Sequence, residues 1–136
     1  MSVAVLRIET PGRGLLEITR EVEDVVAKSG AIAGLATVFV RHTSASLVIQ
    51  ENADPSARRD LDAWLGRLVR DGDPLFTHTL EGPDDMPSHV RAALTATSVG
   101  VPIVGARLGL GAWQGIYLWE HRRHGSVREL LVHVGA

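Results

Sequence analysis

Three histidines lie in polar, turn-like or helix-start stretches of the sequence, away from apolar stripes: His42, His78 and His89. Neutral imidazole is the commonest protein ligand for zinc and related transition metals, and three protein ligands leave a coordination position open for water or substrate. Their spacing carries little weight, because no pair has the i, i+4 register of a helix-borne zinc motif. The pattern indicates a candidate metal site, with ordinary hydrogen-bonded surface histidines as the alternative for each residue.

Carboxylate and amide side chains accompany these histidines, at Glu51, Asn52, Asp54, Asp84 and Asp85. Such groups bind Mg²⁺ directly, or they orient a metal-bound histidine by accepting a hydrogen bond from its other ring nitrogen. Asp54 and Asp85 also suit helix N-caps, and capping alone explains Asp54. Asp84 beside Asp85 is harder to explain by structure, because adjacent like charges repel unless a cation or an arginine offsets them.

The stretch 113–121 alternates with the period of a strand, which places the aromatic residues and one histidine on the same face: Trp113, Tyr117, Trp119 and His121. Such a face either stacks on a planar heterocycle or forms core or subunit interface, and the second role is the commoner. Glu120 ends the opposite, largely apolar face. A carboxylate there is expected to pair with an arginine such as Arg107, or to take part in proton transfer.

These residues must be positioned by a mixture of strands and helices. Runs rich in β-branched and aromatic residues predict strands at 3–8, 35–41, 46–50, 99–104, 107–110, 113–121 and 127–134. Helical periodicity predicts three helices, over 18–29, from the Asp54-Pro55 cap to the breakers at 71–74, and from Asp85 to about 97. Residues 11–14 read as a turn or loop and 123–126 as a hairpin turn. The irregular order of elements favours an α+β domain with a largely antiparallel sheet.

The same periodicity assigns buried faces to the second and third helices. The second is expected to bury Ala57, Leu61, Trp64, Leu65 and Leu68. The third is expected to bury Val90, Ala93, Leu94 and Thr97. His89 then falls on a different side of the first turn, where it can point outward.

The composition narrows the class of protein. A chain of 136 residues suits one domain over 1–136 and buries a core without disulfides. It has no cysteine, so a transition metal must use His and carboxylate. A formal net charge of -2 with scattered positive residues argues against nucleic acid as a partner. No basic leader precedes an apolar run and no stretch approaches bilayer length, so we expect a soluble cytoplasmic protein.

Four ordered segments resemble the signatures of the YjbQ-type family, the secondary thiamine-phosphate synthases. They are HTSASL at 42–47, ENADP at 51–55, EGPDDMPSH at 81–89 and LGAWQGIYL at 110–118. The resemblance covers nearly the whole chain. Ala112 stands where a hydroxyl residue is expected, and Trp119 where a smaller one is usual.

The resemblance implies an α+β fold that assembles as a homotrimer, an assembly that the aromatic face of 113–119 also favours. It implies a weak thiamine-phosphate synthase activity, which joins a pyrimidine methyl diphosphate to a thiazole phosphate and releases pyrophosphate. The metal or phosphate ligands would be His42, His78 and His89. Their supports and the pocket rim would be Asn52, Asp84, Asp85, Glu120 and Arg122. A divalent cation, zinc or magnesium, and arginine would neutralise the leaving group.

Two other classes of protein fit the same residues. A metal-dependent hydrolase of a small phosphorylated or amide substrate would use metal-bound water as its nucleophile. A non-catalytic trimeric small-molecule-binding protein would use the motifs only to shape a pocket and an interface. The metal content of the protein, and its activity with and without that metal, separate the three hypotheses.

Overall fold

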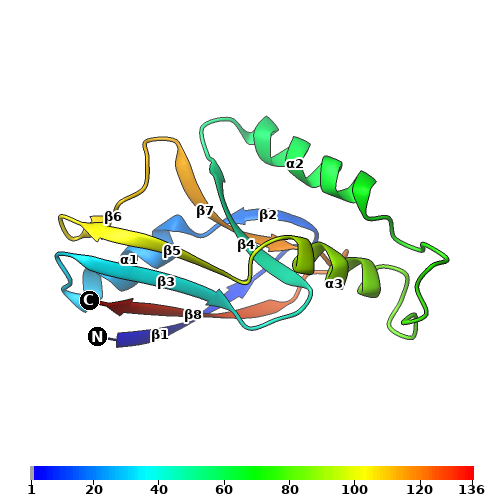
Figure 1. Cartoon of the computed structure of the whole chain (residues 1–136), viewed down its shortest axis with the longest axis horizontal. Helices are drawn as coiled ribbons and strands as arrows, with labels where there is room; N and C mark the ends of the chain where they lie inside the picture. The colour runs from blue at the N-terminus through cyan, green and yellow to red at the C-terminus, as the bar shows by residue number, and fades with distance from the viewer. Residues whose placement is uncertain (1) are drawn as a thin grey trace.

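The structure, a computed structural model that describes residues 2–136, consists of two antiparallel sheets and three helices (Figure 1). The large sheet contains, in spatial order, β1 (Ser2–Glu9), β8 (Val127–Gly135), β3 (Gly34–Val40), β5 (Ser98–Val104) and β6 (Arg107–Leu108). The small sheet contains β2 (Gly14–Glu17), β7 (Gln114–Glu120) and β4 (Ala45–Glu51). The predicted α+β class with antiparallel pairing is confirmed. β2 was not among the predicted strands.

The hydrophobic core lies between the two sheets. Val38 and Leu130 of the large sheet face Leu47 and Leu118 of the small sheet in one cluster, and all four are fully buried. Burying an aliphatic side chain of this size stabilises a fold by about 1.5 to 3 kcal/mol. α1 (Thr19–Ser29) adds its apolar face to the same cluster and ends at Gly30, whose φ of 73° is a left-handed conformation that glycine adopts readily.

α2 (Pro55–Leu68) covers the outer face of the small sheet. It begins as the sequence predicts, because the Asp54 side chain accepts a hydrogen bond from the backbone N–H of Ser56 at 2.9 Å. Leu65 is buried beneath the helix as predicted, together with Trp119 of β7. The predicted burial of Trp64 and Leu68 is wrong, since these side chains are 56% and 58% exposed.

The aromatic face of β7 is covered by this helix. Tyr117 and Trp119 are buried, and the indole N–H of Trp119 donates to Asp62 of α2 at 2.8 Å. Trp113 lies before the strand and is exposed. Because the chain buries Tyr117 and Trp119 within its own fold, they are not an exposed surface for subunit contact, and the sequence argument for a trimer from this face is wrong.

α3 (Asp85–Leu94) buries a polar face, contrary to the apolar face predicted for it. Ala93 and Leu94 are exposed and Thr97 is exposed too, whereas Ser88 and Arg91 are buried. The Ser88 hydroxyl lies 2.6 Å from the carbonyl of residue 84 and 2.9 Å from that of residue 121, and Arg91 donates to the carbonyl of residue 69 at 2.6 Å. Buried polar groups are tolerated where hydrogen bonds of this kind offset their desolvation.

The predicted hairpin at 123–126 is wrong, because β7 and β8 lie in different sheets and the segment crosses from one to the other. This crossing is held against the first loop: the backbone N–H of Thr10 donates to the carbonyl of Ser126 at 2.8 Å. A Cβ on Gly125 would overlap the carbonyl oxygen of Thr10, so only glycine permits this close approach. This crossing segment thereby places residues 121–126 beside the N-terminal end of α3.

The chain ends lie side by side, because β1 and β8 pair along their whole lengths, with Ser2 opposite Val134 (Figure 1). Among residues 2–136, no helix combines the length and the apolar character that a membrane span requires.

Candidate functional site

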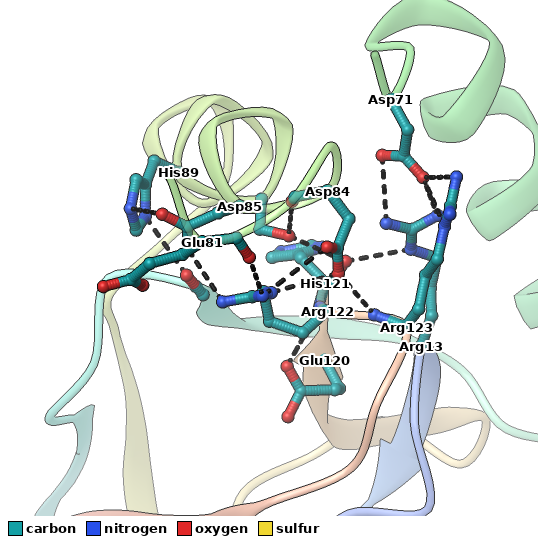
Figure 2. A network of polar contacts seen from close by, with 12 residues as sticks. Arg13, Asp71, Glu81, Asp84, Asp85, His89, Glu120, His121, Arg122 and Arg123 are labelled. Atoms are coloured by element: carbon teal, nitrogen blue, oxygen red, sulfur yellow. Dashed lines mark hydrogen bonds and ion pairs between the residues drawn. The ribbon is translucent and has the colours of Figure 1, made fainter. Parts of the chain in front are cut away.

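A polar pocket of about 490 Å³ opens where three segments meet. The loop between β3 and β4 contributes residues 42–44, and the start of α3 with the loop before it contributes residues between 78 and 89. The β7 to β8 crossing contributes residues between 122 and 126, and Arg128 comes from the start of β8. Figure 2 shows side chains from the second and third of these segments meeting at the N-terminal end of α3. The structure brings all three predicted histidines to this pocket: His42, His78 and His89.

Two of the histidines form a compact cluster with Asp85. Nε2 of His78 lies 2.9 Å from Oδ2 of Asp85, and Nε2 of His89 lies 3.3 Å from the same oxygen. The three ligand atoms are all within 4.8 Å of one another, which is close enough to hold one metal ion. Asp85 is buried, whereas the His78 side chain is 55% exposed, so the cluster opens to solvent on the His78 side.

The tautomer of His89 is fixed by the loop between β3 and β4. Nδ1 of His89 lies 3.0 Å from the carbonyl oxygen of Thr43, an atom that can only accept, so Nδ1 carries the proton. The Nε2 lone pair of a neutral His89 then faces the carboxylate of Asp85. Two electron-rich atoms 3.3 Å apart repel unless a proton or a cation lies between them. Metal-binding histidines commonly donate their other N–H to a carbonyl in this way.

Arg122 offsets the paired charges of Asp84 and Asp85, the offset that the sequence called for. Its guanidinium donates to Asp84 at 3.0 Å and to Asp85 at 2.8 Å (Figure 2). Burial alone would raise the pKa of Asp84, but hydrogen bonds from the Arg123 backbone N–H and the Arg122 side chain outweigh it, and the pKa falls to about 2. Asp85 makes no helix cap, contrary to one expectation, because its oxygens face Arg122 and the two histidines.

Glu120 lies beneath the pocket and does not line it. Both oxygens accept hydrogen bonds from Arg128, at 2.7 and 2.8 Å, and Oε1 also accepts from the Thr10 hydroxyl at 2.7 Å. The expected pairing of Glu120 with an arginine is therefore confirmed, with Arg128 as the partner in place of the suggested Arg107. A carboxylate so fully occupied has no free lone pair aimed at a substrate, which corrects the expectation that Glu120 is catalytic. It fixes the position of Arg128 instead.

His42 lies beside the compact cluster and not in it. Its Nδ1 accepts from the backbone N–H of Ser44 at 2.9 Å, and its Nε2 lies 2.8 Å from Nη1 of Arg128. Burial lowers the pKa of His42, and the charge of Arg128 lowers it further. Ser44 also connects the two histidines, because its hydroxyl lies 3.1 Å from Nδ1 of His89.

Asn52 is not part of this pocket, contrary to expectation. It follows β4 at the end opposite His42, and a seven-residue strand spans roughly 20 Å. There its amide donates to Glu17 at 3.2 Å, and the Thr19 hydroxyl donates to the same oxygen at 2.8 Å. Asn52 and Glu17 therefore form a separate polar cluster.

Sequence reasoning missed Arg128, although a signal for it existed. β8 turns alternate residues inward, and Arg128 has the same parity as the buried Leu130 and Val132. A charged residue in phase with core positions needs a buried partner, and Glu120 at the end of another apolar face is that partner.

A second set of ion pairs was also missed, at Asp71. Arg13 donates to both its oxygens, at 2.9 and 3.1 Å, and Arg123 donates at 2.9 Å (Figure 2). Arg91 lies 3.4 Å from one of the same oxygens. Burial would raise the pKa of Asp71, but the arginines outweigh it and lower the pKa. Asp71 thereby ties the first loop and the β7 to β8 crossing to the chain between α2 and α3, which holds the pocket walls together.

Fold and site define a small α+β protein of two antiparallel sheets, with a histidine, aspartate and arginine pocket at the end of its third helix. The chain belongs to the family described as UPF0047 protein YjbQ-like, whose sequence profile matches residues 4–136. It is 52% identical over 130 residues to a UPF0047 protein of Synechocystis sp., covering 96% of this chain and 88% of that one. It is 38% identical to the UPF0047 protein YjbQ of Escherichia coli O157:H7, covering 93% and 91%.

Solved structures agree on the fold. A crystal structure of a hypothetical protein from Aeropyrum pernix superimposes with a TM-score of 0.90 at 27% identity, covering 100% of this chain and 99% of that one. A conserved hypothetical protein from Thermus thermophilus gives a TM-score of 0.87 at 35% identity, covering 97% and 99%. The predicted family is thus confirmed by sequence and by fold.

Proposed function

We propose that this chain is a thiamine-phosphate synthase of low activity that works with a divalent cation at His78, Asp85 and His89. The family resemblance suggests the reaction. The thiazole nitrogen bonds to the methylene carbon of the pyrimidine as the bond from that carbon to the diphosphate oxygen breaks, and pyrophosphate leaves with the electron pair. No oxidant or reductant is required.

The observation that carries the proposal is the arrangement around His89. Thr43 accepts the Nδ1 proton, so a neutral His89 presents a lone pair toward Asp85 and His78. Two imidazoles and one carboxylate favour zinc or a related transition metal, because magnesium prefers oxygen ligands throughout. When bound, the cation would supply positive charge to neutralise the departing diphosphate.

The arginines of the pocket explain why a cation is needed. Arg122 is paired with Asp84 and Asp85, and Arg128 with Glu120. These guanidiniums provide direction for hydrogen bonds but little net positive charge. Neutralising the negative charge that develops on a departing diphosphate during the reaction therefore requires a further positive group in the pocket.

An apolar recess beside the polar pocket suits the uncharged ring of a substrate. It has a volume of about 390 Å³ and is lined by Ala92, Ala93 and Thr97. His42 and His89 line both cavities, so they stand at the division between them. A ligand with a flat ring and a phosphoryl tail matches this pair of environments.

The experiment measures pyrophosphate and thiamine phosphate after untagged protein is mixed with both substrates. We expect the two products in equal amounts with zinc-loaded protein, and none after chelation until zinc is restored. A His133→Ala variant serves as the control, because His133 lies on β8 outside the pocket. Zinc-loaded protein that forms neither product would refute the proposed reaction.

A metal-dependent hydrolase is the second candidate, and the exposure of His78 favours it. Two histidines and one carboxylate with an open side are the ligand pattern of zinc sites that activate water. The same assay separates the two, because a hydrolase releases pyrophosphate from the pyrimidine diphosphate when the thiazole phosphate is omitted. Zinc binding without either reaction would point to a small-molecule-binding protein.

Assembly into a homotrimer also belongs to the proposal, with the outer face of the large sheet as the contact surface. Val5 lies opposite Leu131, and Leu131 opposite Phe39, in adjacent strands, and Val5 and Phe39 are exposed. An exposed apolar stripe across three strands is unusual on a monomer. Light scattering at micromolar concentration should give three times the chain mass, and a monomer would contradict this.

A further inference from the structure

Both ring nitrogens of His42 face hydrogen-bond donors. The backbone N–H of Ser44 points at Nδ1 from 2.9 Å, and Nη1 of Arg128 lies 2.8 Å from Nε2. A neutral imidazole has one lone pair for hydrogen bonding, and an imidazolium has none. One of these two contacts therefore sets a donor against a donor.

The conflict falls on the Arg128 side. The backbone N–H of Ser44 cannot turn away, because it is part of the loop that leads into β4, so Nδ1 must accept and Nε2 must carry the proton. Arg128 is a side chain and has more freedom than a backbone group, although its Nε and Nη2 both donate to Glu120. Glu120 in turn is held by the Thr10 hydroxyl and by the backbone N–H groups of residues 121 and 122. With the proton on Nε2, the imidazole N–H and Nη1 of Arg128 thus lie donor against donor, 2.8 Å apart, in the wall of the pocket.

An acceptor bound by both donors removes this conflict, whereas a metal ion does not. A cation would be repelled by the guanidinium and would find no lone pair on Nε2. The Arg128 side chain is 5% exposed, and a buried guanidinium whose Nη1 is not used by Glu120 is a strong partner for a charged oxygen.

We propose that His42 and Arg128 form an oxyanion subsite for the phosphoryl group of a small phosphorylated molecule, so that His42 is an anion donor and not a cation ligand. The subsite deepens the proposed function and rests on it only for the neighbouring cation cluster of His78, Asp85 and His89. Ser126 and His124 line the same wall of the pocket. His42 also lines the apolar recess. A ligand whose phosphoryl group binds His42 and Arg128 would therefore place an uncharged ring in that recess.

The variant that tests this is His42→Asn. An asparagine side-chain oxygen accepts from the backbone N–H two residues on, so the hydrogen bond to Ser44 is kept while the Nε2 donor is lost. Arg41→Gln is the matched control. Arg41 is adjacent to His42 in the sequence, is exposed and pairs with Glu129, so this variant removes a positive charge next to His42. Two titrations are made by calorimetry, one with Zn²⁺ and one with inorganic pyrophosphate on chelator-treated protein.

We expect His42→Asn to bind Zn²⁺ as the wild type does and to bind pyrophosphate at least about tenfold more weakly, from the loss of one charge-assisted hydrogen bond. Arg41→Gln should match the wild type in both titrations. On wild-type protein, ¹⁵N NMR should find the His42 proton on Nε2, and pyrophosphate should shift that signal.

Three results would overturn the subsite: loss of Zn²⁺ affinity in His42→Asn, no binding of pyrophosphate by metal-free wild-type protein, or a proton on Nδ1 of His42. Wild-type protein that binds pyrophosphate but no Zn²⁺ would instead refute the proposed cation site at His78, Asp85 and His89 and would still support the oxyanion subsite.

Discussion

β4 runs between two polar clusters that differ in how well their hydrogen-bonding groups are matched. At its far end, Asn52 and Thr19 donate to Glu17, and each of these hydrogen bonds joins a donor to an acceptor. At its near end, Nε2 of His89 lies 3.3 Å from a carboxylate oxygen of Asp85, and Nε2 of His42 lies 2.8 Å from a guanidinium nitrogen of Arg128. Both clusters have residue types suited to chemistry.

The two clusters have similar polar residue types and differ in hydrogen-bond complementarity, and we use that complementarity to propose which of them is a ligand site. Buried groups that satisfy one another stabilise the fold. Groups held in conflict by fixed partners are compatible with a folded protein when a ligand resolves the conflict. We therefore propose that the near cluster binds a ligand and that the far cluster has a structural role.

The largest expected effect is on activity at the near cluster. His89→Ala should abolish metal-dependent turnover while the melting temperature stays close to that of the wild type, because the His89 side chain is 28% exposed. Thermal melts and turnover are measured on the same sample, with His133→Ala as control. A large fall in melting temperature with unchanged activity per folded molecule would make His89 a packing residue.

The next effect is on stability beneath the pocket. Glu120→Ala leaves Arg128 buried without its partner, and we expect a loss of about 3 to 5 kcal/mol in the free energy of unfolding. Chemical denaturation measures the loss, and Glu120→Gln, which keeps an acceptor oxygen, should lose less. Equal stability of Glu120→Ala and the wild type would show that the buried pair does not hold the fold.

The pH dependence of stability comes from groups next to the pocket. Burial lowers the pKa of His121 to about 3, so the folded state keeps it neutral while the unfolded chain takes up a proton below about pH 6.5. This contribution is complete above pH 6.5 and is lost as the pH falls toward 3. The loss is at most about 1.4 kcal/mol per pH unit.

The depressed pKa of Asp84, about 2, acts in the same direction but only below about pH 4. Denaturation of His121→Gln between about pH 7 and about pH 4 separates the two groups, because this variant should be less sensitive to pH over that interval. An unchanged pH profile would show that His121 is not responsible.

The smallest effect is expected at the far cluster. Asn52→Ala should cost about 1 kcal/mol of stability through the lost hydrogen bond to Glu17 and leave turnover and zinc affinity unchanged. Denaturation and turnover assays measure both quantities. A loss of activity as large as that of His89→Ala would remove the distinction between the two clusters.

Local sequence signals predicted most elements and part of the site. The Asp54 cap, the strands flanking His42 and the arginine needed beside Asp84 and Asp85 follow from short-range chemistry. The hairpin at 123–126 was wrong because strand partners depend on contacts distant in sequence, and β8 pairs with β1 and β3.

The buried face of α3 could not be predicted for a related reason. Arg91 is buried because the carbonyl of residue 69 accepts its N–H, and Ser88 because the carbonyl of residue 121 accepts its hydroxyl. Helical periodicity takes account of the polarity of a side chain, but it does not predict a hydrogen-bond partner that is distant in sequence. For the same reason Arg128 was not predicted as a site residue, and Asn52 was wrongly expected beside the histidines.

Zinc titration of the wild type, His89→Ala and Asn52→Ala tests the central claim most directly. We expect one ion per chain for the wild type and Asn52→Ala with the same affinity, and a loss of affinity by at least about tenfold for His89→Ala, because one of three protein ligands is removed. Equal zinc affinity in all three proteins, or no binding by the wild type, would contradict the account.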